Sequence, residues 1–190
     1  ASVHALVVET PTLTVVLDTC IGNDKERMPN KNWHKMQTRF LEDFRAAGFD
    51  PEKIDAVLCT HLHVDHVGWN TYWDGAAWKP TFPNARYLMA KNEFEYWESH
   101  EDDVTPHQVF LDSVAPVVEA GLVDLVETTH VVCPEVSLVP TLGHTPGHVS
   151  VRIQSQGEEA LITGDFLHHP CQMAHPEWAS AVDYDAEAST

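Results

Sequence analysis

The sequence predicts a layered α/β fold formed by a single domain. Short apolar runs predict strands, and segments with apolar residues three or four apart predict helices. These strands and helices are interleaved with long loops, which is typical of sheets with helices packed against them. The chain has 190 residues, of which 43% are hydrophobic, so it is long enough to bury one sizeable core.

The first third of the chain is expected to begin with paired strands. The elements, in chain order, are strands at residues 3–9 and 13–18, a polar loop at 19–33, a helix at 34–47 and a buried strand at 54–60. The first two strands are joined by the turn Thr10-Pro11-Thr12. The helix is expected because Met36, Phe40 and Phe44 share one face. Gly48 provides its end.

The remainder of the chain is expected to alternate between helices and short strands. In chain order it contains a hairpin turning at Asp74-Gly75, a strand at 85–89, helices at 92–99 and 106–120, and strands at 122–126, 136–140, 149–154 and 160–163. Gly121 follows the second helix and is expected to end it. The tail at residues 183–190 looks like the opening of another helix, with Asp185 as its N-cap.

The charge of the chain excludes several classes of partner. The formal net charge is −18, and a field of this sign repels phosphate backbones and anionic lipid. We therefore expect neither nucleic acid nor a membrane as a partner, and a small molecule as the substrate. No stretch approaches the roughly 20 apolar residues of a membrane-spanning helix. We expect a soluble protein, with the cytoplasm as the favoured compartment, and a homodimer is compatible with the sequence.

Potential metal ligands are concentrated directly after the predicted strand at residues 54–60. The chain there reads His61-Leu62-His63-Val64-Asp65-His66. Side chains alternate in an extended segment, so His61 and His63 point the same way and can share one metal ion. Asp65 and His66 follow a turn and can reach a second ion. Zinc accepts imidazole and carboxylate ligands. The alternative is a histidine-rich polar loop, but four such side chains in this order favour metal.

Two later segments each place a potential ligand at a strand end. The turn Gly143-His144-Thr145-Pro146-Gly147-His148 brings a histidine to the start of the strand at 149–154. Gly164-Asp165 follows the apolar strand at 160–163, so a carboxylate lies at that strand's carboxyl end. Ligands on such turns are held by a rigid sheet and still reach an open cleft.

Together, the H-x-H-x-D-H, G-H-T-P-G-H and T-G-D segments resemble the metallo-β-lactamase superfamily. The resemblance implies a four-layered αββα sandwich with the metal ions at one edge of its two sheets. Its motifs assign His61, His63 and His148 to the first metal, Asp65 and His66 to the second, and Asp165 to both. His144 matches a motif histidine that is expected to support a ligand or to be structural.

The resemblance leaves one ligand of the second metal without a counterpart. In the family, a further histidine comes from a late loop, whereas this sequence ends at Thr190. We therefore expect residues 1–190 to be a single metallo-β-lactamase-like domain that is truncated at both ends. The alternative is that His168, His169 or His175 takes the place of the late histidine.

The ligand set implies a dinuclear hydrolase. Two divalent ions are expected as cofactors, with zinc favoured over manganese, iron or cobalt. A bridging hydroxide would be the nucleophile, and Asp65 could orient it or pass a proton to the leaving group. No G-x-S-x-G segment suggests a serine nucleophile. We expect the bond that is cleaved to be an ester, a lactone or a phosphotriester.

Within the superfamily, the chain is most similar to N-acyl-homoserine lactonases and methyl-parathion-type hydrolases. The best-known lactonases carry a tyrosine three residues after the bridging carboxylate, where this chain has His168. This difference favours the organophosphate-hydrolase-like branch. The alternatives are a thioesterase of the glyoxalase II type and a non-catalytic metal-binding module whose site has decayed.

Three residues are expected to contact the substrate. His168 would donate a hydrogen bond to a developing oxyanion, with His169 as its competitor because neighbours on an extended segment face opposite ways. Trp69 and Phe166 would line the cleft, and ordinary core packing is the alternative for each.

Overall fold

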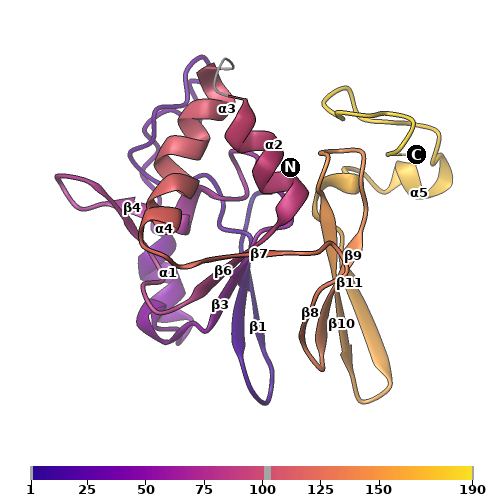
Figure 1. Ribbon diagram of the computed structural model, residues 1–190, viewed down its shortest axis with the longest axis horizontal. Coiled ribbons are helices and arrows are strands. Elements are labelled where there is room, and N and C mark those ends of the chain that lie inside the picture. The colour runs from indigo at the N-terminus through magenta and orange to yellow at the C-terminus, as the bar shows by residue number, and fades with distance from the viewer. Residues whose placement is uncertain (1, 101–103, 190) are drawn as a thin grey trace.

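The computed structural model describes residues 2–100 and 104–189 and contains two β-sheets that face each other (Figure 1). The first sheet has five strands, in the order β1 (Leu6–Glu9), β2 (Thr14–Leu17), β3 (Ala56–Leu58), β6 (Arg86–Ala90) and β7 (Val123–Val126). The second has four, in the order β11 (Glu158–Ile162), β10 (Val149–Ser155), β9 (Val136–Pro140) and β8 (Val131–Cys133). A separate hairpin is formed by β4 (Thr71–Trp73) and β5 (Trp78–Pro80).

The strand directions bring the ends of β2 and β3 to one edge of the first sheet. Strands β2, β3, β6 and β7 run parallel, whereas the second sheet is antiparallel throughout. The carboxyl ends of parallel strands meet at the same edge. Asp18 and the segment 61–66 follow β2 and β3, so this edge is where the metal-binding motif must lie.

Helices cover the outer face of the first sheet (Figure 1). They are α1 (Phe40–Ala46), α2 (Lys91–Ser99), α3 (Val104–Val109), the π-helical segment η3 (Phe110–Val114) and α4 (Ala115–Glu119). Beyond the second sheet, the described residues contain only the turn η4 (Gly164–Phe166) and the short helix α5 (Cys171–Ala174). The predicted layered α/β fold is confirmed.

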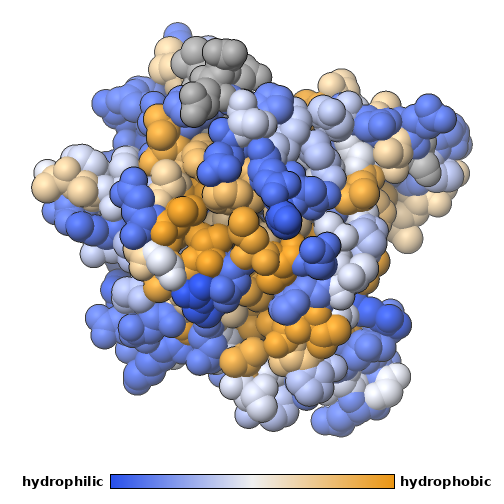
Figure 2. All heavy atoms as spheres, in the orientation of Figure 1, coloured by the Kyte–Doolittle hydropathy of each residue, from blue (hydrophilic) through white to orange (hydrophobic). Residues whose placement is uncertain are grey.

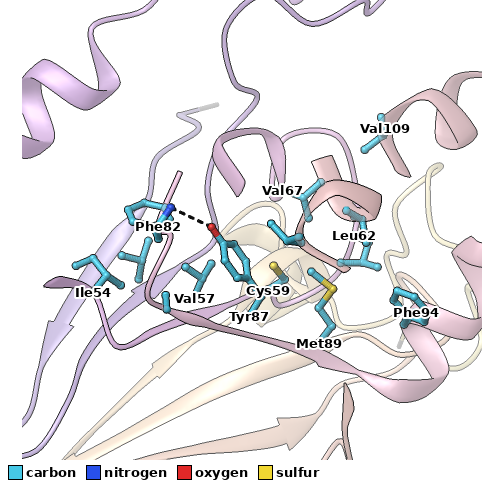
Figure 3. Packing of buried hydrophobic residues seen from close by; sticks show 14 of the residues in the cluster. Ile54, Val57, Cys59, Leu62, Val67, Phe82, Tyr87, Met89, Phe94 and Val109 are labelled. Carbon is cyan, nitrogen blue, oxygen red and sulfur yellow. Dashed lines mark hydrogen bonds between the residues drawn. The ribbon is translucent and has the colours of Figure 1, made fainter. Parts of the chain in front are cut away.

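Alternating residues of the first sheet divide the core in two. Val16, Val57 and Tyr87 face the helices, and their sequence neighbours Val15 and Leu58 face the second sheet. Figure 3 shows the helix-side cluster. Within it, the hydroxyl group of Tyr87 accepts a hydrogen bond from the backbone of Phe82 and donates one to the backbone of Asn70. The alternation of side chains along each strand thus places neighbouring residues in different halves of the core.

The helix predicted at residues 34–47 begins only at Phe40. Lys35 has a left-handed backbone conformation (φ 51°), which an α-helix cannot accommodate. Its N–H donates to the carbonyl oxygen of Lys25 (2.8 Å), and the N–H of Thr38 donates to the side chain of Asn23 (2.8 Å). The backbone groups that would otherwise begin the helix are therefore hydrogen-bonded to the polar loop at 19–33.

Two further predictions differ from the structure in detail. The helix expected at 106–120 is present but includes the π-helical segment Phe110–Val114. The tail at 183–189 forms turns, and Thr190, the last residue of the helix expected there, lies outside the described residues. Asp185 accepts hydrogen bonds from the backbones of Glu187 and Ala188, so it caps a turn rather than a helix.

A buried ionic cluster fixes the loop at 19–39 against the helices. Asp112 in η3 accepts two hydrogen bonds from the guanidinium group of Arg27 (2.7 and 2.8 Å). The ammonium group of Lys25 lies 3.3 Å from the same carboxylate and 3.8 Å from the ring centroid of Trp78. Burial is the main cause that lowers the pKa of Lys25 to about 8. The charges of two buried cations are thus balanced by one buried carboxylate.

The surface combines hydrophilic and apolar regions. Figure 2 shows apolar residues gathered in the middle of one face, with hydrophilic residues around them. The exposed large apolar side chains include Val118, Leu125 and Val131, from α4, β7 and β8. None of the described helices has the length and apolar character needed to cross a membrane.

Candidate metal centre

The segment 61–66 is anchored where it leaves β3. The carboxylate of Asp18 accepts a hydrogen bond from the N–H of Thr60 (2.8 Å) and another from its hydroxyl group (2.9 Å). Asp18 has a left-handed conformation (φ 53°), which turns its side chain toward β3. This contact fixes the starting point of the histidine-rich segment.

Three imidazoles form the first ligand group. Nδ1 of His63 lies 3.1 Å from Nε2 of His61 and 2.9 Å from Nε2 of His144. Two nitrogen ligands of one tetrahedral zinc ion lie roughly 3.4 Å apart, given zinc–nitrogen distances of about 2.1 Å. The separations in the structure are close to this value, so the three rings fit a single metal ion.

The structure places both His144 and His148 beside His61, with ring centroids 4.8 and 5.0 Å from the ring of His61. His144 groups with His61 and His63 as potential ligands, and the assignment of His148 to the first metal stays a prediction. Nε2 of His148 accepts a hydrogen bond from the backbone N–H of Asp165 (3.0 Å). Both histidines are buried.

The second ligand group contains His66 and Asp165. Nε2 of His66 lies 3.4 Å from Oδ1 of Asp165, and its Nδ1 lies 2.8 Å from the carboxylate of Asp18. Oδ1 of Asp65 is 3.9 Å from Nε2 of His66. Together with His61, whose ring also approaches this group, these side chains offer nitrogen and oxygen ligands to a second ion.

Asp165 lies between the two ligand groups. Its Oδ1 faces His66, and its Oδ2 is 3.8 Å from Nε2 of His144 and 3.6 Å from Nε2 of His168. Burial acts to raise its pKa, but the hydrogen bond and positive charge of His66 outweigh this effect and lower the pKa to about 2. Asp165 is therefore ionised and able to bind cations from both sides.

The electrostatic environment of the imidazoles suits metal binding. Burial, reinforced by neighbouring histidines, lowers the pKa of His63 to about 3 and that of His61 well below its usual value. Against the effect of burial, Asp18 and Asp165 raise the pKa of His66. Neutral imidazoles present lone pairs to a cation, so the first group fits a divalent metal.

The histidines of the late segment occupy different places. His168 lies beside Asp165 and His144, with which it forms a third group of potential ligands. Nδ1 of His169 accepts a hydrogen bond from the backbone of Cys171, and the ring of His175 stacks on Trp178 at 4.1 Å. Of the three candidates for the missing ligand, only His168 is at the site.

A cavity of about 340 Å³ opens beside the second group, and its lining includes Asp65, Leu167 and His168. Neither Trp69 nor Phe166 belongs to the described residues that line this cavity. Trp69 is 5% exposed and stacks on Phe40 with ring centroids 5.0 Å apart. Trp69 therefore packs in the core, and together with Phe40 it also lines a separate cavity of about 550 Å³. Its contact with the substrate stays a prediction.

Several residues that hold the ligands were missed by the sequence analysis. Asp18 contacts His66, and Asp183 accepts a hydrogen bond from Nδ1 of His144 (2.9 Å). Nδ1 of His148 lies 2.9 Å from the hydroxyl group of Thr141. A partner on the second ring nitrogen fixes the orientation of an imidazole. The position of Asp18 at the end of a predicted strand was an available signal, whereas Asp183 had none.

The sequence of this chain matches a known protein family. A family model for the metallo-beta-lactamase superfamily matches residues 1–188. Among curated proteins, an N-acyl homoserine lactonase of a Bacillus species is 28% identical over 120 residues, which are 63% of this chain and 41% of the relative. Another from Bacillus thuringiensis is 27% identical over 134 residues, which are 68% of this chain and 45% of the relative. The matched part thus spans less than half of these relatives.

Solved structures share the fold. A probable metal-dependent hydrolase from Staphylococcus aureus has a TM-score of 0.83 at 23% identity, covering 98% of this chain and 66% of its own. AbOPH, a hydrolase in the beta lactamase superfamily, has a TM-score of 0.77 at 25% identity, covering 97% and 63%. AidC, a dizinc quorum-quenching lactonase, has a TM-score of 0.76 at 20% identity, covering 97% and 64%.

Proposed function

Because this chain belongs to the metallo-beta-lactamase superfamily, we propose that it is a dinuclear metal-dependent hydrolase that cleaves an ester, lactone or phosphotriester bond. The observation that carries the proposal is the position of Asp165. Its two carboxylate oxygens lie 3.4 Å from Nε2 of His66 and 3.8 Å from Nε2 of His144. A carboxylate between two groups of imidazoles can bind a pair of catalytic ions, one on each side.

We propose the following assignment of the ligands. His61 and His63 would hold the first ion together with His144 or, as the sequence motifs assign, His148. Asp65 and His66 would hold the second ion, and Asp165 both. When bound, divalent ions polarise a carbonyl or phosphoryl oxygen and acidify water. The donor set favours zinc, with manganese, iron and cobalt as alternatives.

Two side chains at the cavity are proposed to act on the substrate. Asp65 lines the cavity, where its carboxylate can orient water and transfer a proton to the leaving group. His168 also lines it, and its imidazole can donate a hydrogen bond to the oxygen on which negative charge develops. Asp18 would support the reaction indirectly by holding Nδ1 of His66.

Two observations favour different substrates. The curated relatives are N-acyl homoserine lactonases, which favours a lactone. His168, three residues after Asp165, favours the phosphotriester, because the resemblance places a tyrosine there in lactonases. A cavity of about 340 Å³ suits a small substrate of either kind.

A panel of four substrates tests the proposal. The zinc-loaded chain would be assayed with an N-acyl homoserine lactone, an aryl ester, a phosphotriester and a thioester. The background is an Asp165→Ala variant, which loses the shared carboxylate. We expect turnover of at least one of the first three substrates above this background. Cleavage of the thioester alone would point to a thioesterase, and no turnover despite two bound ions would favour a non-catalytic metal-binding module.

A further inference from the structure

The carboxylate of Glu93 connects the two segments that carry the first ligand group. It accepts hydrogen bonds from the N–H of Leu62 at Oε1 (3.0 Å) and from the N–H of Gly147 at Oε2 (2.9 Å). Leu62 lies between His61 and His63, and Gly147 follows His144 by three residues. Each oxygen of one carboxylate is therefore bonded to a different ligand-bearing segment.

Glu93 is 1% exposed, so its charge must be stabilised within the protein. A third hydrogen bond comes from the indole Nε1–H of Trp97 (2.7 Å). In the part of the chain that the structure describes, no cationic side chain forms an ion pair with Glu93. Three N–H donors thus stabilise the anion, which makes the contact directional rather than a simple attraction between charges.

The first turn of α2 holds the later segment tightly. A Cβ atom added at Gly147 would lie 2.3 Å from the backbone nitrogen of Glu93, so no larger residue fits there. The side chain of Asn92 donates a hydrogen bond to the carbonyl oxygen of Pro146 (2.9 Å). The ring of Trp97 packs edge-on against His63, with centroids 5.3 Å apart. Helix α2 therefore contacts both segments and one of the imidazoles.

We propose that Glu93 is a positioning residue that sets the separation between the His61–His63 pair and His144, and thereby the affinity for the first metal ion. The inference rests on the metal site of the proposed function. An isosteric amide is informative because Glu93→Gln has one acceptor oxygen instead of two. Its NH₂ group would face an N–H donor on one of the two segments and push that segment away.

The zinc dissociation constant of the purified chain tests this role by chelator competition. We expect Glu93→Gln to weaken zinc binding by about 10–100-fold, as is typical when a partner of the ligands is lost. Glu95→Gln is the control on the same helix, because Glu95 is exposed and forms a surface ion pair with Lys91. Tyr87→Phe is the control for stability, since it removes buried hydrogen bonds away from the ligand segments.

A second measurement requires no metal. In the metal-free chain, hydrogen exchange should show protected amides at Leu62 and Gly147. We expect Glu93→Gln to lose protection at one or both, while the amides of β9 and β10 remain protected. Glu93→Asp is the second variant, because it retains the charge but is one methylene too short to reach both segments.

Unchanged zinc affinity in a folded Glu93 variant would overturn the proposal. So would an equal loss of affinity in Tyr87→Phe, because the effect would then reflect stability alone. The proposed hydrolase activity is judged separately, on the unaltered chain. Zinc binding that depends on Glu93 without any hydrolysis would refute the activity and leave the positioning role intact.

Discussion

Nε2 of His148 accepts a hydrogen bond from the backbone N–H of Asp165 (3.0 Å). Gly164 makes this approach possible, because a Cβ atom there would lie 2.7 Å from the same nitrogen. Nδ1 of His148 is also engaged, at 2.9 Å from the hydroxyl group of Thr141. Both ring nitrogens of His148 thus have a partner, one on the backbone of Asp165 and one on the side chain of Thr141.

Paired glutamine variants separate the roles of His144 and His148. We expect His144→Gln to weaken zinc binding by more than about 100-fold, because a direct ligand is lost. We expect His148→Gln to weaken it by about 10–100-fold, because its amide oxygen can still accept the bond from Asp165. Chelator competition measures both constants. The reverse order would identify His148 as the ligand.

Asp165→Ala should affect both ions. Its carboxylate faces imidazoles of both groups, so we expect zinc content to fall from about two ions per chain to one or fewer. Turnover on the best substrate of the panel should fall with it. Elemental analysis of dialysed protein gives the metal content. A variant that retains two ions and full turnover would show that Asp165 is not shared.

His168→Phe tests the proposed contact with the substrate. Removing one donor to a developing oxyanion typically lowers turnover by about 10²–10³-fold. We expect this loss without a change in metal content, and little effect from His169→Phe, whose histidine bonds the backbone of Cys171. A fall in metal content would instead make His168 a ligand. Unchanged turnover would leave it a structural residue.

The metal-free chain should lose stability on mild acidification. Burial lowers the pKa of His63 to about 3 and that of His148 to about 4. Below the ordinary value near 6.5, the unfolded chain binds protons that the folded chain does not, so stability falls as the pH falls. Each such histidine contributes about 1.4 kcal/mol per pH unit.

Urea unfolding in the presence of a chelator, at pH 6, 5.5 and 5, measures this slope, below the range in which the raised pKa of His66 acts in the opposite direction. Asp165 does not contribute to this slope. Its lowered pKa stabilises the folded chain, and this stabilisation is lost only when the pH falls below the usual pKa of an aspartate, toward 2. His63→Gln should have a shallower slope. Stability that is constant or increases over this range would contradict the prediction.

Asp112→Asn should destabilise the chain far more than a surface substitution does. The variant would leave Lys25 and Arg27 buried without their anion, which typically costs about 3–5 kcal/mol. Glu42→Gln is the control, because Glu42 is exposed and pairs with Arg39 at the surface. Such a pair contributes less than about 1 kcal/mol. Equal free energies of unfolding for the two variants would show that the cluster is dispensable.

The parts of the fold that follow a local pattern could be predicted from the sequence. Strands β2, β3 and β6 are short apolar runs, which can be recognised without knowledge of their neighbours. The helix expected at 34–47 was partly wrong because its first residues are bonded to a loop that lies earlier in the chain. Hydrogen bonds between loops leave no periodic signal.

The site shows the same division between local and distant information. The segment 61–66 could be identified because alternation and strand ends are local properties. The choice between His144 and His148 could not, since both occur in one short turn and either could face the metal. The contacts of the two rings come from distant parts of the chain, because His144 bonds Asp183, 39 residues away, and His148 bonds the backbone of Asp165.

Because the residues of β3 alternate between the two faces of the sheet, metal binding depends on the pairing register of this strand. A shift of this strand by one residue would exchange its two faces and move His61 by about 3.3 Å along the sheet. Val57 would then face the second sheet, and His61 would lose its place beside His63. A measurement of zinc affinity therefore tests the pairing register of β3. A preparation in which β3 is shifted by one residue would fail to retain the ion.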